Sequence, residues 1–158
     1  MIAAIVALVA LVPHLTMPSP WVRVSPPPAT AVSTSLAEYA LPNALPKQDT
    51  SNTQYVLLVR KAMDDGGFGG YISDLEYTLQ QNRDVTGLHF EPIEDCPRRA
   101  WHFTYVVPLG GVSRTFEESY VATSEYIYRL EYFRPTDQPE NAAARDAVTA
   151  FCKWQTPV

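Results

Sequence analysis

The sequence has few charged residues, and its basic residues are not clustered. Only 18% of the 158 residues are Asp, Glu, Lys or Arg, and the formal net charge at pH 7 is -5. Nucleic-acid binding depends on gathered Lys and Arg side chains, whereas the closest basic groups here are the pairs Arg60-Lys61 and Arg98-Arg99. We therefore expect no nucleic-acid partner.

Motifs that mark common catalytic or phosphate sites are also lacking. There is no G-x-S-x-G, and neither cysteine has a partner histidine at a recognisable spacing. The glycine run "GGFGG" (residues 66–70) fits no phosphate-loop pattern, and Asp64 and Asp65 before it would repel an anion. These two aspartates also lack the ligand spacing of an EF-hand. We expect the run to be a loop and hinge, with no catalytic residue, metal or cofactor.

Cysteine is scarce. Cys96 lies in the predicted turn "EDCPRR", and Cys152 lies at the end of a predicted C-terminal helix. An even count in an exported chain favours a disulfide, which would stabilise the fold by roughly 4 kcal/mol on the chain-entropy model. The alternatives are two unpaired buried thiols or a metal site, and two distant cysteines without nearby histidines make a poor metal site.

An apolar run, "MIAAIVALVALV", opens the sequence and is closed by Pro13. Its length suits the apolar region of a secretory signal, about 7 to 15 residues, and is short of the roughly 20 needed to cross a bilayer. No Lys or Arg precedes the run and no A-x-A pattern follows it. We predict that residues 1–16 are a signal peptide or an uncleaved membrane tether and that the protein is periplasmic or secreted. A buried strand or helix is the alternative.

The remainder has the composition of one folded domain, since the chain is 46% hydrophobic and 11% aromatic. Residues 17–54 are rich in Pro, Ser and Thr and predict two short edge strands, one at 21–25 and one at 35–41. Residues 55–158 continue the domain with the strand "YVLLVRKAM", a helix, four strands and a final helix.

Each predicted helix has an apolar side. In "YISDLEYTLQQNRDV" the stripe is Ile72, Leu75 and Leu79, and in "ENAAARDAVTAF" we expect Ala144, Ala147 or Val148, and Phe151 to face the sheet. Strands joined by short Gly turns pair antiparallel. The order predicts a single α+β domain, mainly antiparallel sheet, covered by helices on at least one face.

The phrases "YISDLEYTLQQ", "FEESYVATSEYIYRLEYFRP" and "ARDAVTAF" resemble the PsbP/Mog1-like family, including its bacterial relatives of the DcrB type. The resemblance is one of pattern over about residues 55–153 and includes no diagnostic motif. It implies a PsbP/Mog1-like α/β sandwich and a non-enzymatic accessory, binding or assembly role. It implies no active-site residues.

The strand "SEYIYRLEYFRP" places Tyr128, Leu130 and Tyr132 on one side and Arg129 and Glu131 on the other. We expect the tyrosine side, together with the row Trp101, Phe103 and Tyr105, to form the face packed under the helices, and the charged side to face solvent. The alternative is an open groove in which aromatic residues bind a partner. The candidate binding residues are Tyr126, Tyr128, Tyr132 and Trp101.

The histidines offer one alternative chemistry. If "LHFEPIEDC" and "AWHFTY" form a hairpin, Glu91 lies almost opposite His102, with His89 nearby and Glu118 on the next strand. Surface His-Glu pairs explain this arrangement most simply, because zinc needs three or four ligands.

We therefore predict a small exported, non-enzymatic binding or accessory protein whose partner is another protein. The first alternative is an immunity or chaperone-like protein that masks a secreted effector, because net acidity suits a basic target. The second is a metal-dependent enzyme using His89, Glu91 and His102.

Overall fold

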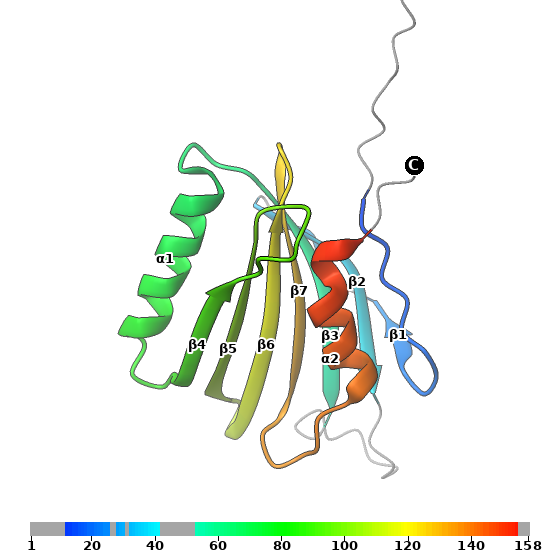
Figure 1. Cartoon of the computed structure of the whole chain (residues 1–158). Helices are drawn as coiled ribbons and strands as arrows, with labels where there is room; N and C mark the ends of the chain where they lie inside the picture. The colour runs from blue at the N-terminus through cyan, green and yellow to red at the C-terminus, as the bar shows by residue number, and fades with distance from the viewer. Residues whose placement is uncertain (1–11, 26–27, 31, 42–52, 155–158) are drawn as a thin grey trace, which may run out of the picture.

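The computed structural model describes residues 12–25, 28–30, 32–41 and 53–154. They form one sheet and two α-helices (Figure 1). In chain order the elements are β1 (Val22–Val24), β2 (Ser33–Leu41), β3 (Gln54–Ala62), α1 (Gly67–Gln81), β4 (Thr86–Pro92), β5 (Ala100–Leu109), β6 (Val112–Ala122), β7 (Tyr126–Pro135), α2 (Ala142–Ala150) and the short 3-10 helix η2 (Phe151–Lys153).

The sheet has the strand order β1-β2-β3-β7-β6-β5-β4, and every neighbouring pair is antiparallel. Strands β4 to β7 form a meander, and the two central strands β3 and β7 join it to the N-terminal strands. The predicted α+β class with a mainly antiparallel sheet is confirmed. Both N-terminal strands exist, but β2 is not an edge strand, because β1 pairs along it.

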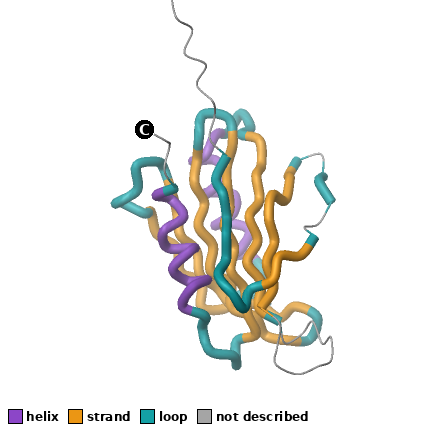
Figure 2. Tube along the Cα trace, turned by 90° about the vertical axis from the view of Figure 1, so that its right-hand side faces the viewer, coloured by secondary structure: helices purple, strands orange, loops and turns teal. Residues whose placement is uncertain are grey.

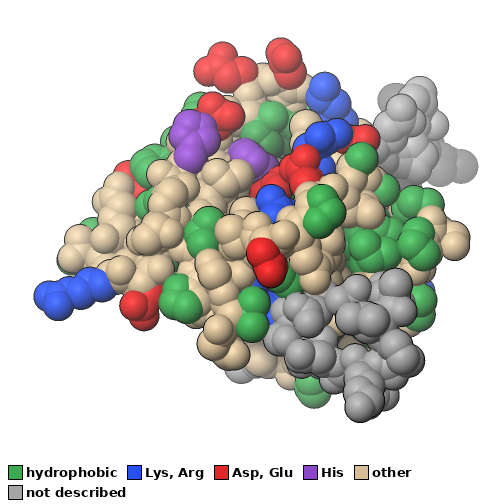
Figure 3. All heavy atoms as spheres, turned by 90° about the horizontal axis from the view of Figure 1, so that it is seen from below, with side chains coloured by type: hydrophobic (Ala, Val, Ile, Leu, Met, Phe, Trp, Pro, Cys, Tyr) green, Lys and Arg blue, Asp and Glu red, His purple; other side chains and the backbone are tan. Residues whose placement is uncertain are grey.

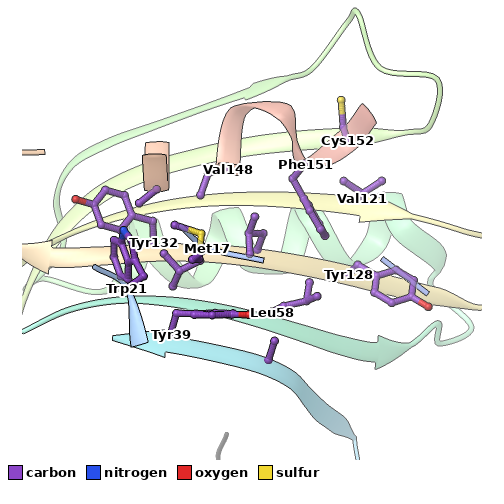
Figure 4. Packing of buried hydrophobic residues seen from close by; sticks show 14 of the residues in the cluster. Met17, Trp21, Tyr39, Leu58, Val121, Tyr128, Tyr132, Val148, Phe151 and Cys152 are labelled. Atoms are coloured by element: carbon purple, nitrogen blue, oxygen red, sulfur yellow. The ribbon is translucent and has the colours of Figure 1, made fainter. Parts of the chain in front are cut away.

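One face of the sheet packs against α2. Tyr128, Leu130 and Tyr132 of β7 are 3%, 1% and 0% exposed and form a cluster with Val148 and Phe151 of the helical segment (Figure 4). Alanine at the helix surface, such as the fully buried Ala144, lets the helix approach the strands closely. The sides predicted for this strand and this helix to face the core are confirmed.

The N-terminal segment closes the same core. Pro13, Met17 and Trp21 are buried, and the Leu15 carbonyl accepts a hydrogen bond of 3.2 Å from the Tyr39 hydroxyl. The Trp21 indole N–H donates to the Asn141 side chain over 3.3 Å, at the residue that caps α2. We call residues 12–21 the N-terminal strap. The leader boundary predicted at residue 16 falls inside this packed segment, while residues 1–11 lie outside the described part.

The other face packs against α1. Phe68 and Ile72 of the helix meet Phe103, Tyr120 and Ile127 of the strands, and all five are at most 4% exposed. Ile127 and Tyr128 are successive residues of β7 and enter different clusters, so the two helices cover opposite faces of the sheet. Figure 2 shows the same arrangement turned by 90°.

The glycine run was wrongly predicted to be a loop, because α1 begins inside it at Gly67. Gly67 has a φ of 64°, a conformation that glycine adopts without strain, and Gly69 and Gly70 lie in the first turn. Glycine is a poor helix former, but burial of the Phe68 ring fixes this turn on the sheet. Tertiary packing here overrides local propensity.

The predicted arrangement of the aromatic rows is also partly wrong. The register pairs Trp101 with Tyr120, and Tyr120 with Arg129. The row Trp101, Phe103 and Tyr105 therefore lies on the α1 face, opposite the face that holds Tyr128 and Tyr132. Arg129 and Glu131 share the α1 face, and Glu131 is only 7% exposed, so this side of β7 does not face solvent as predicted.

Among the described residues, no helix has both the length and the apolar character needed to cross a membrane.

Candidate functional site

Four aromatic rings cross the α1 face in a row from β3 to β5. The register places Tyr55 opposite Phe133, Phe133 opposite Phe116, and Phe116 opposite Tyr105. Their ring centroids are 5.1, 5.2 and 5.1 Å apart, and the planes of successive rings differ by 18°, 15° and 3°. We call this set the aromatic ladder.

The spacing determines what the aromatic ladder presents to a ligand. Neighbouring strands are about 4.8 Å apart, so nearly parallel rings at this distance stand upright and stack face to face. The inner ring faces are therefore covered, and the ring edges point away from the sheet. Phe116 is 8% exposed, whereas Tyr55, Phe133 and Tyr105 are half-buried. The ladder is an apolar strip across four strands that is open in part.

A buried acid pair lies beside the aromatic ladder. Glu118 of β6 and Glu131 of β7 are cross-strand partners and are 1% and 7% exposed. The Tyr120 and Tyr105 hydroxyls donate to the two Glu118 oxygens over 2.8 and 3.1 Å. The Arg129 guanidinium lies 3.8 Å from Glu118 and 3.4 Å from Glu131.

Burial controls the protonation of this pair. Burial raises the pKa of Glu131 to about 8, with a smaller opposing effect from Arg129 and a further increase from Glu118. Burial and the neighbouring Glu118 also raise the pKa of both Tyr105 and Tyr120 above the usual value for tyrosine. Glu131 therefore holds its proton at neutral pH, and a single guanidinium balances the charge that remains. This arrangement stabilises the sheet beneath the ladder.

The histidines lie on the other face. Glu91 pairs with His102 across β4 and β5, as predicted, and His89 Nε2 is 3.6 Å from Glu91 Oε2 on an exposed surface. Figure 3 shows histidine and acidic side chains side by side. Burial lowers the pKa of His102, whose Nδ1 lies 3.3 Å from Ser119 Oγ. Glu118 is separated from them by the sheet. Within the described part of the chain, no group of three or more His, Cys, Asp or Glu side chains is placed to hold a metal.

Two open hollows lie near the upper loops. One, of about 470 Å³, adjoins the histidines and is lined by Glu91, Pro92, Ile93, Glu94, Asp95, His102 and Thr149. The other, of about 490 Å³, adjoins the start of α1 and is lined by Met63, Gly67, Phe68, Arg98, Arg99, Ala122, Thr123 and Ser124. The first is acidic, and the second combines an apolar floor with two guanidinium groups.

The candidate binding residues proposed from sequence have different surroundings. Tyr128 and Tyr132 are core residues, and the Tyr132 hydroxyl donates to Gln54 over 2.6 Å. Tyr126 is half-buried beneath the Arg60 guanidinium, whose carbon is 4.6 Å from the ring centroid. Trp101 is half-buried on the opposite face. The open-groove alternative therefore does not apply to Tyr128 or Tyr132.

The two cysteines meet, but the disulfide predicted between them is not present. Both are free thiols, and Cys96 Sγ donates to the Cys152 carbonyl oxygen over 3.3 Å. The Cys96 sulfur is thus engaged with the backbone. Cys152 is fully buried, and burial, with a further effect from Cys96, raises its pKa to about 12.

Sequence reasoning missed most of the aromatic ladder. Of its members only Tyr105 belonged to a predicted aromatic row, although Tyr55, Phe116 and Phe133 all lie in predicted strands. Strand alternation showed that each ring points to one face, but it did not show which rings are neighbours. That depends on the register of three separate strand pairs.

Comparison with known proteins supports the class of fold. No family model and no curated protein matches the chain, so membership of the PsbP/Mog1-like family is not confirmed. Among solved structures, the fold is similar to that of LpqN of Mycobacterium tuberculosis, a protein described as involved in cell envelope biogenesis. The TM-score is 0.53 with 14% sequence identity, and the match covers 89% of this chain and 79% of LpqN. At this identity the similarity defines the fold alone.

Proposed function

We propose that this protein is a small exported, non-enzymatic binding or accessory protein of the cell envelope, periplasmic or secreted. The observation that carries the proposal is the aromatic ladder. It is an apolar strip, open in part, on a rigid sheet, and exposed aromatic side chains are favoured at binding surfaces.

The location is supported by two independent features. The apolar run "MIAAIVALVALV" has the length of a secretory signal. The fold is similar to that of LpqN, which is involved in cell envelope biogenesis. Fold similarity at low identity is only an analogy for function, so the location needs its own test.

A non-catalytic role is supported by the positions of the acid and base groups. General acid-base catalysis requires a group with a shifted pKa within reach of a substrate. The carboxyl group with the strongly raised pKa, Glu131, is 7% exposed and lies within the sheet-helix layer. His89 and Glu91 are exposed and contact each other as a surface pair.

The partner is another protein. The ladder presents ring edges, and its inner ring faces are covered, so a sugar ring has little aromatic face on which to stack. The Tyr105 hydroxyl is occupied by Glu118, which leaves few polar groups along the strip. Apolar side chains of a protein partner suit such a strip best.

A second candidate is an immunity or chaperone-like protein that masks a secreted effector. The acidic hollow supports it, because Glu91, Glu94 and Asp95 line one side and the chain carries a net charge of -5. A basic segment of an effector would complement this hollow.

The test uses cross-linking from the native host followed by mass spectrometry of the captured partners. Tyr55→Ala opens the outer end of the ladder, and Tyr77→Ala on the 65%-exposed face of α1 is its matched control. We expect the first to reduce capture of a specific partner at least tenfold and the second to leave it unchanged. Melting curves confirm that both variants fold. Equal capture by Tyr55→Ala and the parent would reject the ladder as the binding surface.

Two further measurements separate the alternatives. Loss of capture in Glu94→Lys, with Tyr55→Ala unaffected, would favour the acidic hollow and the effector-masking function. Cell fractionation that finds the protein soluble in the cytoplasm with residues 1–16 intact would reject the proposed location.

A further inference from the structure

One end of the domain pairs arginine side chains with aromatic rings. The Arg98 guanidinium carbon lies 4.5 Å from the Trp154 ring centroid, and the same side chain donates to the Trp154 carbonyl over 3.0 Å. Arg60 lies 4.6 Å from the ring centroid of Tyr126. We call these four residues the arginine-aromatic patch.

The patch is anchored on the core behind it. The Trp154 ring meets Tyr128 at a centroid distance of 5.4 Å and Phe151 at 4.9 Å. Tyr126 meets Tyr128 at 6.1 Å. Trp154 and Tyr126 are themselves half-buried, so each has one side on the core and one side at the surface.

The described chain starts and ends at this end of the sheet. Figures 1 and 2 show the N-terminal strap beginning there and η2 ending there, close to the turn between β6 and β7. The eleven residues before the strap, "MIAAIVALVAL", carry no charged side chain. Pro13 is buried, so at most one exposed residue, Val12, separates the packed domain from this apolar sequence.

These features share one chemistry. Tyr and Trp with nearby Arg or Lys are typical of protein surfaces at the membrane-water boundary, where the rings sit at the headgroup level and the cations contact phosphates. We propose that this end of the domain rests on a lipid membrane, with the patch at the headgroups and the apolar N-terminal sequence supplying the hydrophobic attachment. This inference rests on the proposed envelope location.

Net charge is not the basis of the contact. Lys153 is exposed at the same end, but Asp64 pairs with Lys61 over 3.5 Å, and Glu125 lies exposed in the turn between β6 and β7. The strap, which packs on the core up to Trp21, holds the domain in one orientation relative to the apolar sequence. The aromatic ladder lies on the other face of the sheet and remains accessible.

The experiment measures binding of the full chain to vesicles of phosphatidylcholine and phosphatidylglycerol by co-flotation. We expect binding by the parent chain and roughly fivefold weaker binding or less affinity still for Arg60→Glu, since each basic group near an anionic surface contributes on that order. Arg83→Glu makes the same charge change in the exposed loop after α1, at the other end of the sheet, and we expect less than a twofold change.

A second readout locates the indole ring. Brominated lipids quench tryptophan at the headgroup-acyl boundary, and we expect the quenching seen with the full chain to fall by more than half in Trp154→Phe. Equal quenching in both chains, no binding by the parent chain, or equal loss in Arg60→Glu and Arg83→Glu would overturn the inference. Such results leave the proposed function standing if fractionation finds the protein exported, whereas a cytoplasmic location rejects that function directly.

Discussion

Glu118 and Glu131 lie directly opposite each other on β6 and β7, both almost closed to solvent, with Arg129 as their shared cation. Two carboxyl groups so close together cannot both ionise without a large cost in a buried environment. The protonation of this pair therefore links the stability of the domain to pH.

The first prediction follows from Glu131, whose pKa is about 8 in the folded protein and about 4.3 in an unfolded chain. Between these values the folded state binds the proton more tightly, so the contribution of Glu131 to stability is complete below about pH 4 and is lost as pH rises to about 8. We expect Glu131→Gln to flatten this decline in a series of urea titrations between pH 5 and 9. The exposed Glu91→Gln is the control, and parallel curves for the parent and Glu131→Gln would contradict the assignment.

The second prediction concerns Arg129. The sequence predicted an exposed side chain that could be replaced at a cost under about 0.5 kcal/mol, as at ordinary surface sites. Since the guanidinium balances buried carboxyl groups, we now expect Arg129→Ala to destabilise the domain by about 3 to 5 kcal/mol at neutral pH. Arg83→Ala, at an exposed loop residue, should cost under about 0.5 kcal/mol. Equal melting temperatures for the two variants would show that the acid pair does not depend on Arg129.

The third prediction tests the two cores separately. Phe103 on the α1 face is 0% exposed and Tyr128 on the α2 face is 3% exposed. Replacing either with Ala should destabilise the domain by roughly 3 to 5 kcal/mol, measured by chemical denaturation. Leu109→Ala, at a residue 53% exposed, is the matched control and should cost well under that. An unchanged melting curve for Tyr128→Ala, combined with loss of partner capture, would restore the groove interpretation for that residue.

The fourth prediction concerns thiol reactivity. Only the thiolate reacts with iodoacetamide, and Cys152 is fully buried with a pKa of about 12. We expect Cys96, which is partly exposed, to be alkylated first in native protein at pH 8, and Cys152 to react only in denaturant. Mass spectrometry of the labelled peptides measures this order. Absence of labelling at both residues, even in denaturant without reductant, would contradict the free-thiol state.

The sequence predicted the elements better than their pairing. Strand alternation in "EYIYRLEYFRP" correctly identified the buried row Tyr128, Leu130 and Tyr132. It did not reveal that Trp101 aligns with Arg129, because shifting one strand by a single residue exchanges the two faces. Polar residues on the second face were therefore assigned to solvent, although α1 and the neighbouring strands enclose them.

The start of α1 failed for a different reason. Local propensity argues against a helix in "GGFGG", and only the contact of Phe68 with the sheet explains why the helix begins there. The meeting of Cys96 and Cys152 was predicted from their places at the ends of elements, but placement alone does not determine whether a bond forms. Long-range packing and redox state are not encoded in a local pattern.

The pairing of β3 with β7 has a consequence for the order in which the chain folds. Strands β1 to β3 and strands β4 to β7 are joined mainly through local hairpins, but the pair at the middle of the sheet brings Tyr55 next to Phe133. Contacts between distant residues form slowly because a long loop must close first. The N-terminal strands therefore wait, without their central neighbour, until β7 has emerged from the ribosome or from an export channel.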